Sequence, residues 1–349
     1  MKRVRLCVVL ALCVIGYATA ASKQTGHDLP TKKESAEMLR QADDFIDAVS
    51  DGRQDRQADA VLHAIRGQGA ELLAIRNSRR ATHVVSKSVK AQDIIGDGSA
   101  RGLKMRLYRP LAAAKKPLPL LVYFHGGGWT WGGIESCAAF CDALAATGKV
   151  MVLAVDYSLA PEKPFPAGLM DCVSAVEYAF SHAKKWGSAA GMVSAGGDSS
   201  GGNLALATAL YMNKNATAGQ RLHSLVLLYP VVKAYADKES KSWKKYGRGY
   251  GLDKRLMEAF CDAYIAKGNK NDPLVSPVDA TPAQLSKLPP MLLVGAERDI
   301  LRDQGAEFAG KLKNVRRVEF PGAVHLFITV PGQKAAFDKA VSLVSSYLD

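Results

Sequence analysis

Short apolar runs alternate with amphipathic stretches along most of the chain. The apolar runs predict β-strands at residues 118–124, 150–156, 192–196, 222–229, 290–295 and 315–320. Apolar positions at helical spacing predict helices between them, at residues 135–147, 169–185, 200–213, 303–313 and 333–348. Strands that alternate with helices in this way indicate an α/β fold with a mostly parallel central sheet, covered by helices on both faces.

The segment before this alternation has a different pattern. Apolar positions predict two helices, at Ala36–Val49 and Ala58–Ile75, and the polar residues 51–57 separate them. Two further strands are expected, at Ala81–Ala91 and Leu103–Arg109. We therefore expect an N-terminal helical segment over residues 21–80, followed by a catalytic domain over residues 81–349.

One long insertion breaks the alternation of strands and helices. Residues 231–270 are rich in Lys, Tyr, Gly and Trp, and they contain an amphipathic piece at Leu252–Ile265. The insertion lies between two core strands, where a lid over an active site would be attached.

The first twenty residues have the pattern of a secretory signal peptide. A basic start precedes the apolar stretch Leu6–Tyr17, and Ala18–Ala20 offer the small residues that a signal peptidase requires. The stretch is too short for a permanent membrane span, and no later apolar run reaches that length. We therefore expect a secreted or periplasmic protein. Lipid attachment at Cys13 is a weaker alternative, because the leucine directly before this cysteine fits a lipoprotein signal poorly.

The chain has a formal net charge of +13, a hydrophobic content of 48% and a charged content of 23%, as in ordinary globular enzymes. Its densest basic clusters, Lys241–Lys245 and Arg79–Arg80, are short. We interpret them as solvated faces, with attraction of an anionic substrate or surface as the alternative. No nucleic-acid-binding motif accompanies them, so a nucleic-acid partner is not expected.

The cysteines of the mature chain do not have the spacing of a metal site. Removal of residues 1–20 leaves Cys137, Cys141, Cys172 and Cys261. Cys137 and Cys141 are four residues apart on one face of a predicted helix, where small apolar packing is favoured over a disulfide. There is no C-x-x-C motif or His/Cys cluster, so we expect neither a metal nor another cofactor.

Two glycine-rich motifs carry the candidate chemistry. Residues 197–201 read Gly-Asp-Ser-Ser-Gly, between a predicted strand and a predicted helix, and this is the context of a nucleophile elbow at Ser199. The flanking glycines are needed there because a Cβ would clash with the adjoining strand or helix. Residues 125–128 read His-Gly-Gly-Gly, where glycine N–H groups can approach a developing oxyanion. Together the motifs indicate a serine hydrolase.

A serine nucleophile needs a histidine base, which in this fold type follows the serine in the chain. Only His223 and His325 follow Ser199. His223 lies beside a predicted strand and before any suitable acid, so we interpret it as an edge or surface residue. His325 follows the strand at 315–320 in a loop at its carboxyl end, where sites of open α/β sheets form. We therefore predict that His325 is the base.

The base in turn needs an acid that orients it. Asp299 is the leading candidate, because it lies just past the strand at 290–295, in the loop before a helix. Asp303 begins that helix and is better suited to its positive end, whereas Glu297 is nearer the strand and suited to a local salt bridge.

These motifs resemble those of the hormone-sensitive lipase-like family of α/β-hydrolases, which includes many bacterial esterases and the arylacetamide deacetylases. The matching segments are Tyr123–Trp129, Asp156–Glu162, Phe165–Ala167, Gly197–Asn203, Asp272–Pro277, Asp299–Asp303 and His325–Phe327. The resemblance covers roughly residues 100–349. It implies an α/β-hydrolase fold with Ser199, Asp299 and His325 as nucleophile, acid and base. It also implies an oxyanion hole of N–H groups from the 126–128 run, Gly126 and Gly127 foremost, and from Ser200.

The resemblance further implies a helical cap, here the N-terminal segment up to residue 80 and the insertion at 231–270. Three positions depart from the family pattern: Ser158 replaces a usual arginine, Ser200 a usual alanine and Leu326 a common glycine. We expect His125 to form hydrogen bonds within its own loop, and Asp198 and Glu162 to hold loops near the elbow. Three aromatic residues are expected either in the pocket or in the core, namely Trp129, Trp131 and Tyr157.

The expected function is hydrolysis of short-chain acyl esters by a serine carboxylesterase, through an acyl-enzyme intermediate and without a cofactor. Two alternatives stay open: a deacetylase that acts on acetylated sugars or aryl amides, and a catalytically silent ligand-binding member of the fold. The expected partner is a small ester, and a homodimer is left open.

Overall fold

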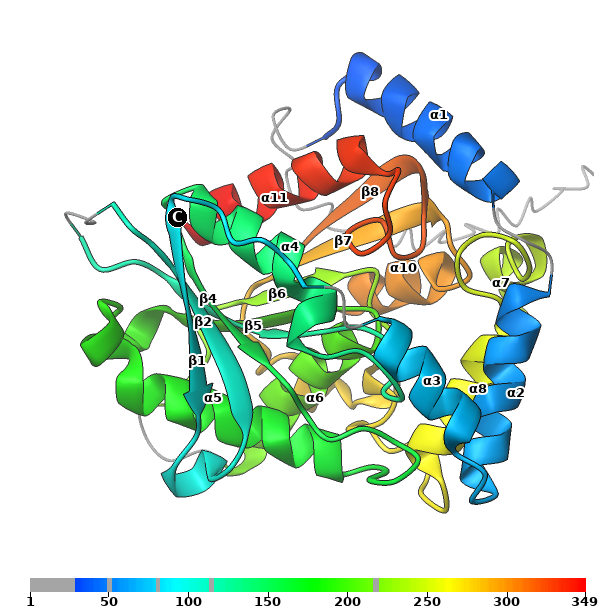
Figure 1. The fold of residues 1–349 in the computed structure, drawn as a ribbon, viewed down its shortest axis with the longest axis horizontal. Coiled ribbons are helices and arrows are strands. Elements are labelled where there is room, and N and C mark those ends of the chain that lie inside the picture. The colour runs from blue at the N-terminus through cyan, green and yellow to red at the C-terminus, as the bar shows by residue number, and fades with distance from the viewer. Residues whose placement is uncertain (1–28, 49–51, 80–81, 113–115, 216–219) are drawn as a thin grey trace, which may run out of the picture.

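The computed structural model describes residues 29–48, 52–79, 82–112, 116–215 and 220–349, so the predicted signal peptide at 1–20 and Cys13 lie outside the described residues. One sheet with strand order β1-β2-β4-β3-β5-β6-β7-β8 forms the centre of the described part (Figure 1). The strands are β1 (Val89–Ile95), β2 (Lys104–Pro110), β3 (Leu120–Phe124), β4 (Met151–Val155), β5 (Val193–Asp198), β6 (Leu225–Leu228), β7 (Met291–Arg298) and β8 (Val315–Val324). The pairs β1–β2 and β2–β4 are antiparallel and all others are parallel, so the predicted α/β-hydrolase fold is confirmed.

Helices cover both faces of this sheet (Figure 1). One face carries α4 (Ile134–Ala146) and α11 (Lys334–Leu348), and the other carries α5 (Ala167–Trp186), α6 (Ser200–Asn215) and α10 (Arg302–Gly310). Successive strand residues point to opposite faces, so each interior strand contributes to both cores and reads as a continuous apolar run.

The N-terminal helices lie in two separate places (Figure 1). Helix α1 (Lys32–Ala48) packs against β8 and α11, and its Gln41 side chain accepts a hydrogen bond from the N–H of Ala335 at 2.9 Å. Helix α2 (Arg53–Ile65) instead packs along α8 (Lys254–Ile265) of the insertion, with α3 (Ala70–Ser78) beside it. Of the segment expected as one N-terminal cap, only α2 and α3 therefore lie beside the insertion.

Polar contacts hold α2 to the insertion. Arg255 of α8 pairs with Asp59 at 2.5 Å, and the N–H of Asp253 donates to the Gln54 side chain at 2.7 Å. The insertion also contains α7 (Lys241–Lys245), which packs against α10, and the short helix α9 (Pro282–Leu285) follows the insertion. No helix in the described ranges is long and apolar enough to cross a membrane.

Two predicted elements differ from the structure. The helix expected at 58–75 is broken into α2 and α3, because Gly67 has a positive φ of 85° that a continuing helix cannot accommodate. The strand expected at 81–91 begins only at Val89. Part of the preceding segment is tied to α4 instead, where the buried Asp142 accepts hydrogen bonds from the hydroxyl and N–H of Ser86.

Cys137 and Cys141 lie on α4, and both are buried free thiols, as are Cys172 and Cys261. Burial and the neighbouring Cys141 sulfur raise the pKa of the Cys137 thiol above its usual range. The expectation of apolar packing rather than a disulfide is therefore confirmed for these two cysteines.

Candidate active site

Ser199 lies in a strained turn between β5 and α6. Its φ of 54° is in the left-handed region, and its N–H donates to the carbonyl of Leu228 at 2.9 Å. A Cβ at Gly197 or Gly201 would fall on the carbonyl oxygen of Phe124, at the end of β3. Glycines at both positions therefore let the turn pass against the neighbouring strand, as the sequence motif predicts.

His325 connects Ser199 to Asp299. The Ser199 hydroxyl lies 2.9 Å from His325 Nε2, and His325 Nδ1 lies 2.6 Å from Asp299 Oδ2. Both His325 and Asp299 are 1% exposed, and Asp299 Oδ1 also accepts from the N–H of Leu301 at 2.9 Å. With Nδ1 protonated and donating to the carboxylate, Nε2 is free to accept the serine proton. The three residues singled out in the sequence thus form one hydrogen-bonded chain.

The competing residues lie in other contacts. The Glu297 carboxylate accepts from the N–H of Gly322 at 2.7 Å, and the Asp303 carboxylate accepts from the N–H of Ser242 at 2.8 Å. His223 is exposed at the start of β6, as expected for a surface residue. Among these candidates the geometry selects Asp299 and His325 as the partners of Ser199.

The glycine loop after β3 faces the same serine. Gly127 and Gly128 have positive φ values of 120° and 58°, and both line a cavity with Ser199. The N–H of Gly126 already donates to Asp198 Oδ1 at 3.0 Å, so it is not free to bind an oxyanion. Among the described residues nothing accepts from the N–H groups of Gly127, Gly128 or Ser200.

His125 serves its own loop. Its Nδ1–H donates to the carbonyl of Gly126 at 2.8 Å, and its ring stacks on Tyr157 with 4.2 Å between centroids. Burial lowers the pKa of His125, so the ring stays neutral. The Tyr157 hydroxyl donates to the carbonyl of His125 at 2.7 Å, which places Tyr157 under the loop. The expected local role of His125 is confirmed.

Asp198, next to the serine, is fully buried. Its Oδ1 also accepts from the Tyr123 hydroxyl at 3.0 Å, whereas its Oδ2 has no hydrogen-bond partner among the described residues. Burial raises the pKa of this carboxyl to about 6, against the lowering effect of its two donors. Asp198 thus fastens the glycine loop to the elbow, which is the loop-holding role expected from the sequence.

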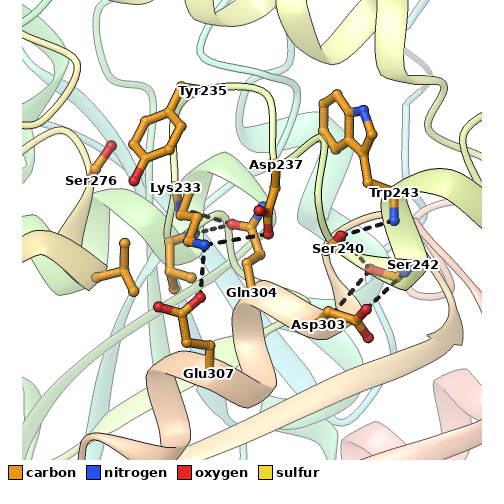
Figure 2. A network of polar contacts seen from close by, with 12 residues as sticks. Lys233, Tyr235, Asp237, Ser240, Ser242, Trp243, Ser276, Asp303, Gln304 and Glu307 are labelled. Atoms are coloured by element: carbon orange, nitrogen blue, oxygen red, sulfur yellow. Dashed lines mark hydrogen bonds and ion pairs between the residues drawn. The ribbon is translucent and has the colours of Figure 1, made fainter.

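A second layer of contacts holds the loop that carries Asp299 (Figure 2). The Ser242 hydroxyl donates to the carbonyl of Ile300 at 2.9 Å and accepts from the N–H of Asp303 at 3.2 Å. Further along α10, the Gln304 side chain accepts from the N–H groups of Val232 and Lys233, both at 2.8 Å. The insertion is therefore fastened to the acid loop through buried polar contacts.

The same network contains one ion-pair cluster (Figure 2). Lys233 pairs with Glu307 at 2.7 Å and with Asp237 at 3.4 Å. These pairs raise the pKa of the Lys233 amine, although burial opposes the shift. The cluster links the start of the insertion to α10.

A cavity of about 270 Å³ opens beside Ser199 and His325. The insertion supplies an apolar wall, with Leu252, Leu256, Met257 and Phe260. Trp131 also lines the cavity, whereas Trp129 is buried in the core and stacks on Tyr264 with 4.4 Å between centroids. Of the three aromatic residues with an open assignment, only Trp131 therefore faces the cavity.

Two arginines at or next to the end of α3 contact the site, and the sequence analysis assigned no role to the first of them, Arg76. Arg76 donates to the carbonyls of Thr130 and Ala160 and forms a bidentate pair with Glu162, with both distances 2.8 Å. It thereby joins α3 to the loop that follows the glycines. Arg79, at the end of α3, lines the cavity together with Gln57. The basic cluster that contains Arg79 is visible in the sequence, but the packing of α3 that brings Arg79 to the cavity is a tertiary contact.

No group of three or more His, Cys, Asp or Glu side chains in the described part of the chain could hold a metal ion. The site itself supplies a serine hydroxyl within hydrogen-bond distance of an imidazole, together with a set of N–H donors.

Comparisons with known proteins agree with this geometry. Residues 121–329 match the sequence profile of the α/β hydrolase fold family. The chain is 36% identical to the carboxylic ester hydrolase LipN of Mycobacterium tuberculosis, over 64% of this chain and 60% of LipN. It is 36% identical to an arylesterase of Saccharolobus solfataricus, over 66% of this chain and 74% of the arylesterase. The match thus spans 60% of the length of LipN, which is less than two thirds of that protein.

The fold is similar to solved esterase structures. A thermostable esterase from Pseudomonas putida ECU1011 superposes with a TM-score of 0.73 at 28% identity, covering 89% of this chain and 97% of that one. The family profile spans more than half of the chain, and it includes both the glycine loop and the nucleophile turn. The chain therefore belongs to the hormone-sensitive lipase-like family of α/β-hydrolases.

Proposed function

We propose that this protein is a carboxylic ester hydrolase in which Ser199 forms an acyl-enzyme with short-chain acyl groups. The single observation that carries the proposal is the hydrogen-bonded chain from Ser199 Oγ through His325 to Asp299, at distances of 2.9 Å and 2.6 Å. Named relatives that hydrolyse carboxylic esters support the reaction class.

In the proposed reaction His325 Nε2 takes the serine proton as Ser199 Oγ attacks the ester carbonyl. Asp299 keeps the imidazole in the required tautomer and stabilises its cation. The N–H groups of Gly127 and Ser200 bind the oxyanion, at about 3 kcal/mol per donor. His325 then gives its proton to the leaving alcohol, and water releases the acid by the same route. Gly126 takes part indirectly, because its N–H is held by Asp198.

The preference for short acyl chains is proposed from the size and lining of the site. A cavity of about 270 Å³ with an apolar wall suits a small acyl group, and α8 closes one side of it. Long chains would have to displace α8, which ion pairs hold to α2.

The test is a rate profile for 4-nitrophenyl acetate, butyrate, octanoate and palmitate, with an aryl amide and an acetylated sugar beside them. We expect kcat/KM to be highest for acetate or butyrate. Ser199→Ala should lower kcat by about 10⁴-fold or more, and Asp299→Asn by a comparable factor. Asp303→Asn, in the first turn of the following helix α10, is the matched control and should retain most activity.

Full activity of the Ser199→Ala protein would contradict the proposed nucleophile. A higher rate on the amide or the acetylated sugar would favour the deacetylase alternative. Specific binding of these compounds without turnover would favour a ligand-binding protein instead.

A further inference from the structure

Arg79 brings a positive charge into the cavity that contains the candidate nucleophile. It lies at the C-terminal end of α3 and lines the same cavity as Ser199 and His325. Its guanidinium carbon is 4.7 Å from the centroid of the Trp131 ring, on the cavity wall. Arg79 is half-buried, so the solvated face expected for the Arg79–Arg80 cluster does not describe this side chain.

No carboxylate in the described part of the chain forms an ion pair with Arg79, although two nearby arginines are paired. Arg76 pairs with Glu162, and Arg106 pairs with Glu135 at 2.8 Å. Glu135 lines the cavity too, so its charge is already matched by an arginine from outside the cavity. The other acid of the cavity wall, Asp198, accepts from Tyr123 and Gly126 instead.

Arg53 adds positive charge beside Arg79. Asp93, Glu135 and Asp156 line a second cavity that Arg79 also borders, but Asp93 and Glu135 pair with Arg106, and none of the three forms an ion pair with Arg79. Burial, together with the positive charge of Arg53, lowers the pKa of Arg79 to about 10, so the guanidinium is still protonated at neutral pH. A half-buried cation without a carboxylate partner has lost hydration, and its contact with the Trp131 ring replaces only part of it. The planar guanidinium can recover the lost hydrogen bonds and gain a counter-charge if it binds a carboxylate through two parallel hydrogen bonds.

We propose that Arg79 binds a carboxylate of the substrate, so that the preferred substrates are esters with a second, anionic carboxylate group. This inference rests on the proposed ester hydrolysis and names its substrate class. The apolar wall of α8 takes the hydrocarbon part, and Arg79 takes the charged end. Hydrolysis then adds water across one ester bond, and the second carboxylate leaves unchanged.

The carboxylate can belong to the acyl part or to the alcohol part. Two pairs of esters distinguish these cases, and the members of each pair differ only in a carboxylate in place of a terminal methyl group. Monoethyl glutarate against ethyl pentanoate tests the acyl side, because a carboxylate replaces a terminal methyl group. The butyrate ester of 3-hydroxypropanoate against propyl butyrate tests the alcohol side in the same way. The measurement is kcat/KM, from the acid or alcohol released.

We expect the wild-type protein to prefer the anionic member of one pair by about tenfold or more. Arg79→Gln should lower kcat/KM for the anionic ester at least tenfold more than for its neutral partner, and Arg79→Lys should keep part of the preference for the anionic ester. Arg66→Gln, which removes an exposed charge at the end of α2, is the matched control and should leave the preference unchanged. A thermal unfolding scan checks that each variant is folded.

The outcomes separate this inference from the proposed function. Ser199-dependent hydrolysis of the neutral esters without any preference for an anionic partner would overturn the role of Arg79 and leave the esterase proposal standing. An equal loss on anionic and neutral esters in Arg79→Gln would assign Arg79 a structural role and likewise overturn it. No Ser199-dependent hydrolysis of any ester would count against the proposed function itself.

Discussion

Asp198 couples two loops of the site through one buried carboxylate. Its two donors, Tyr123 and the N–H of Gly126, come from β3 and the glycine loop. The folded protein raises the pKa of this carboxyl from 3.8 to about 6 because burial disfavours the charged form. Between these pH values the folded state holds a proton that the unfolded state has lost. This contribution to stability is therefore complete below the unfolded pKa and is lost as the pH rises through about 6.

The variant Asp198→Asn tests whether this carboxyl causes the loss of stability as the pH rises. Asparagine can still accept from both donors, but it does not titrate. We expect the free energy of unfolding of the wild type, relative to Asp198→Asn, to fall by about 2 kcal/mol between pH 4 and pH 7. Chemical denaturation across this range measures it, with the exposed Asp262→Asn as the control. A difference that does not change with pH would show that Asp198 is not the titrating group.

Leu326 has a left-handed backbone, with φ at 70°, where relatives of this family commonly have glycine. The side chain lies next to His325 and lines the cavity. The chain thus accepts a conformation that costs a leucine about 1–2 kcal/mol. The departure visible in the sequence therefore corresponds to a local strain beside the candidate base.

At the scale of elements, the loop with Asp299 depends on the insertion for its position. Ser242 of α7 is buried and bonds to the carbonyl of Ile300 and the N–H of Asp303, which both follow Asp299 closely in the chain. Figure 2 shows its contact with Asp303. Removal of the Ser242 hydroxyl leaves the carbonyl of Ile300 and the N–H of Asp303 without this partner. The cost of such buried groups is about 1–3 kcal/mol.

We therefore expect Ser242→Ala to lower stability by that amount and to lower kcat about 10- to 100-fold, with little change in KM. Its matched control is Ser240→Ala. Ser240 caps α7 through the N–H of Trp243 at 3.1 Å. Its hydroxyl lies 3.4 Å from that of Ser242, and within the described residues it makes no hydrogen bond to the acid loop. Steady-state kinetics and thermal unfolding of both variants test this role. An equal loss of kcat in Ser242→Ala and Ser240→Ala would contradict a positioning role for Ser242.

The interior strands could be predicted because both of their faces are buried. Leu225–Leu228 is apolar throughout for this reason. The edge strand β1 was misplaced because one of its faces meets solvent, and Lys90 and Gln92 conceal the pattern. The break at Gly67 was missed because helical spacing of apolar residues continues across it.

The candidate triad could be predicted for two reasons. Each member follows a strand, and the three occur in the order serine, acid, histidine that this fold type uses. The N–H of Gly126 and the side chain of Arg79 could not be assigned in the same way. Their partners, Asp198 and Trp131, lie far away in sequence and meet them only in the folded chain. Local patterns predict which residues carry chemistry, whereas tertiary contacts decide which of their atoms remain free.

For the whole molecule, the packing of α1 bears on assembly. The last strand β8 lies at the edge of the sheet, where an unpaired backbone can join a second chain. Helix α1 packs against this strand, and Leu39 of α1 lies directly on Gly322. The homodimer left open from the sequence would therefore have to displace α1 if it used this edge.

The predicted export of the molecule remains a proposal, and it rests on residues 1–20, outside the described part of the chain. We expect that expression in a bacterial host with a secretory pathway yields a protein in the periplasm or medium whose mass corresponds to residues 21–349. Intact mass spectrometry measures this, because cleavage after Ala20 removes a defined mass. The control is Ala18→Lys with Ala20→Lys, which should block cleavage. A chain that begins at Cys13, carries lipid mass and fractionates with membranes would contradict the proposal and support the lipoprotein alternative.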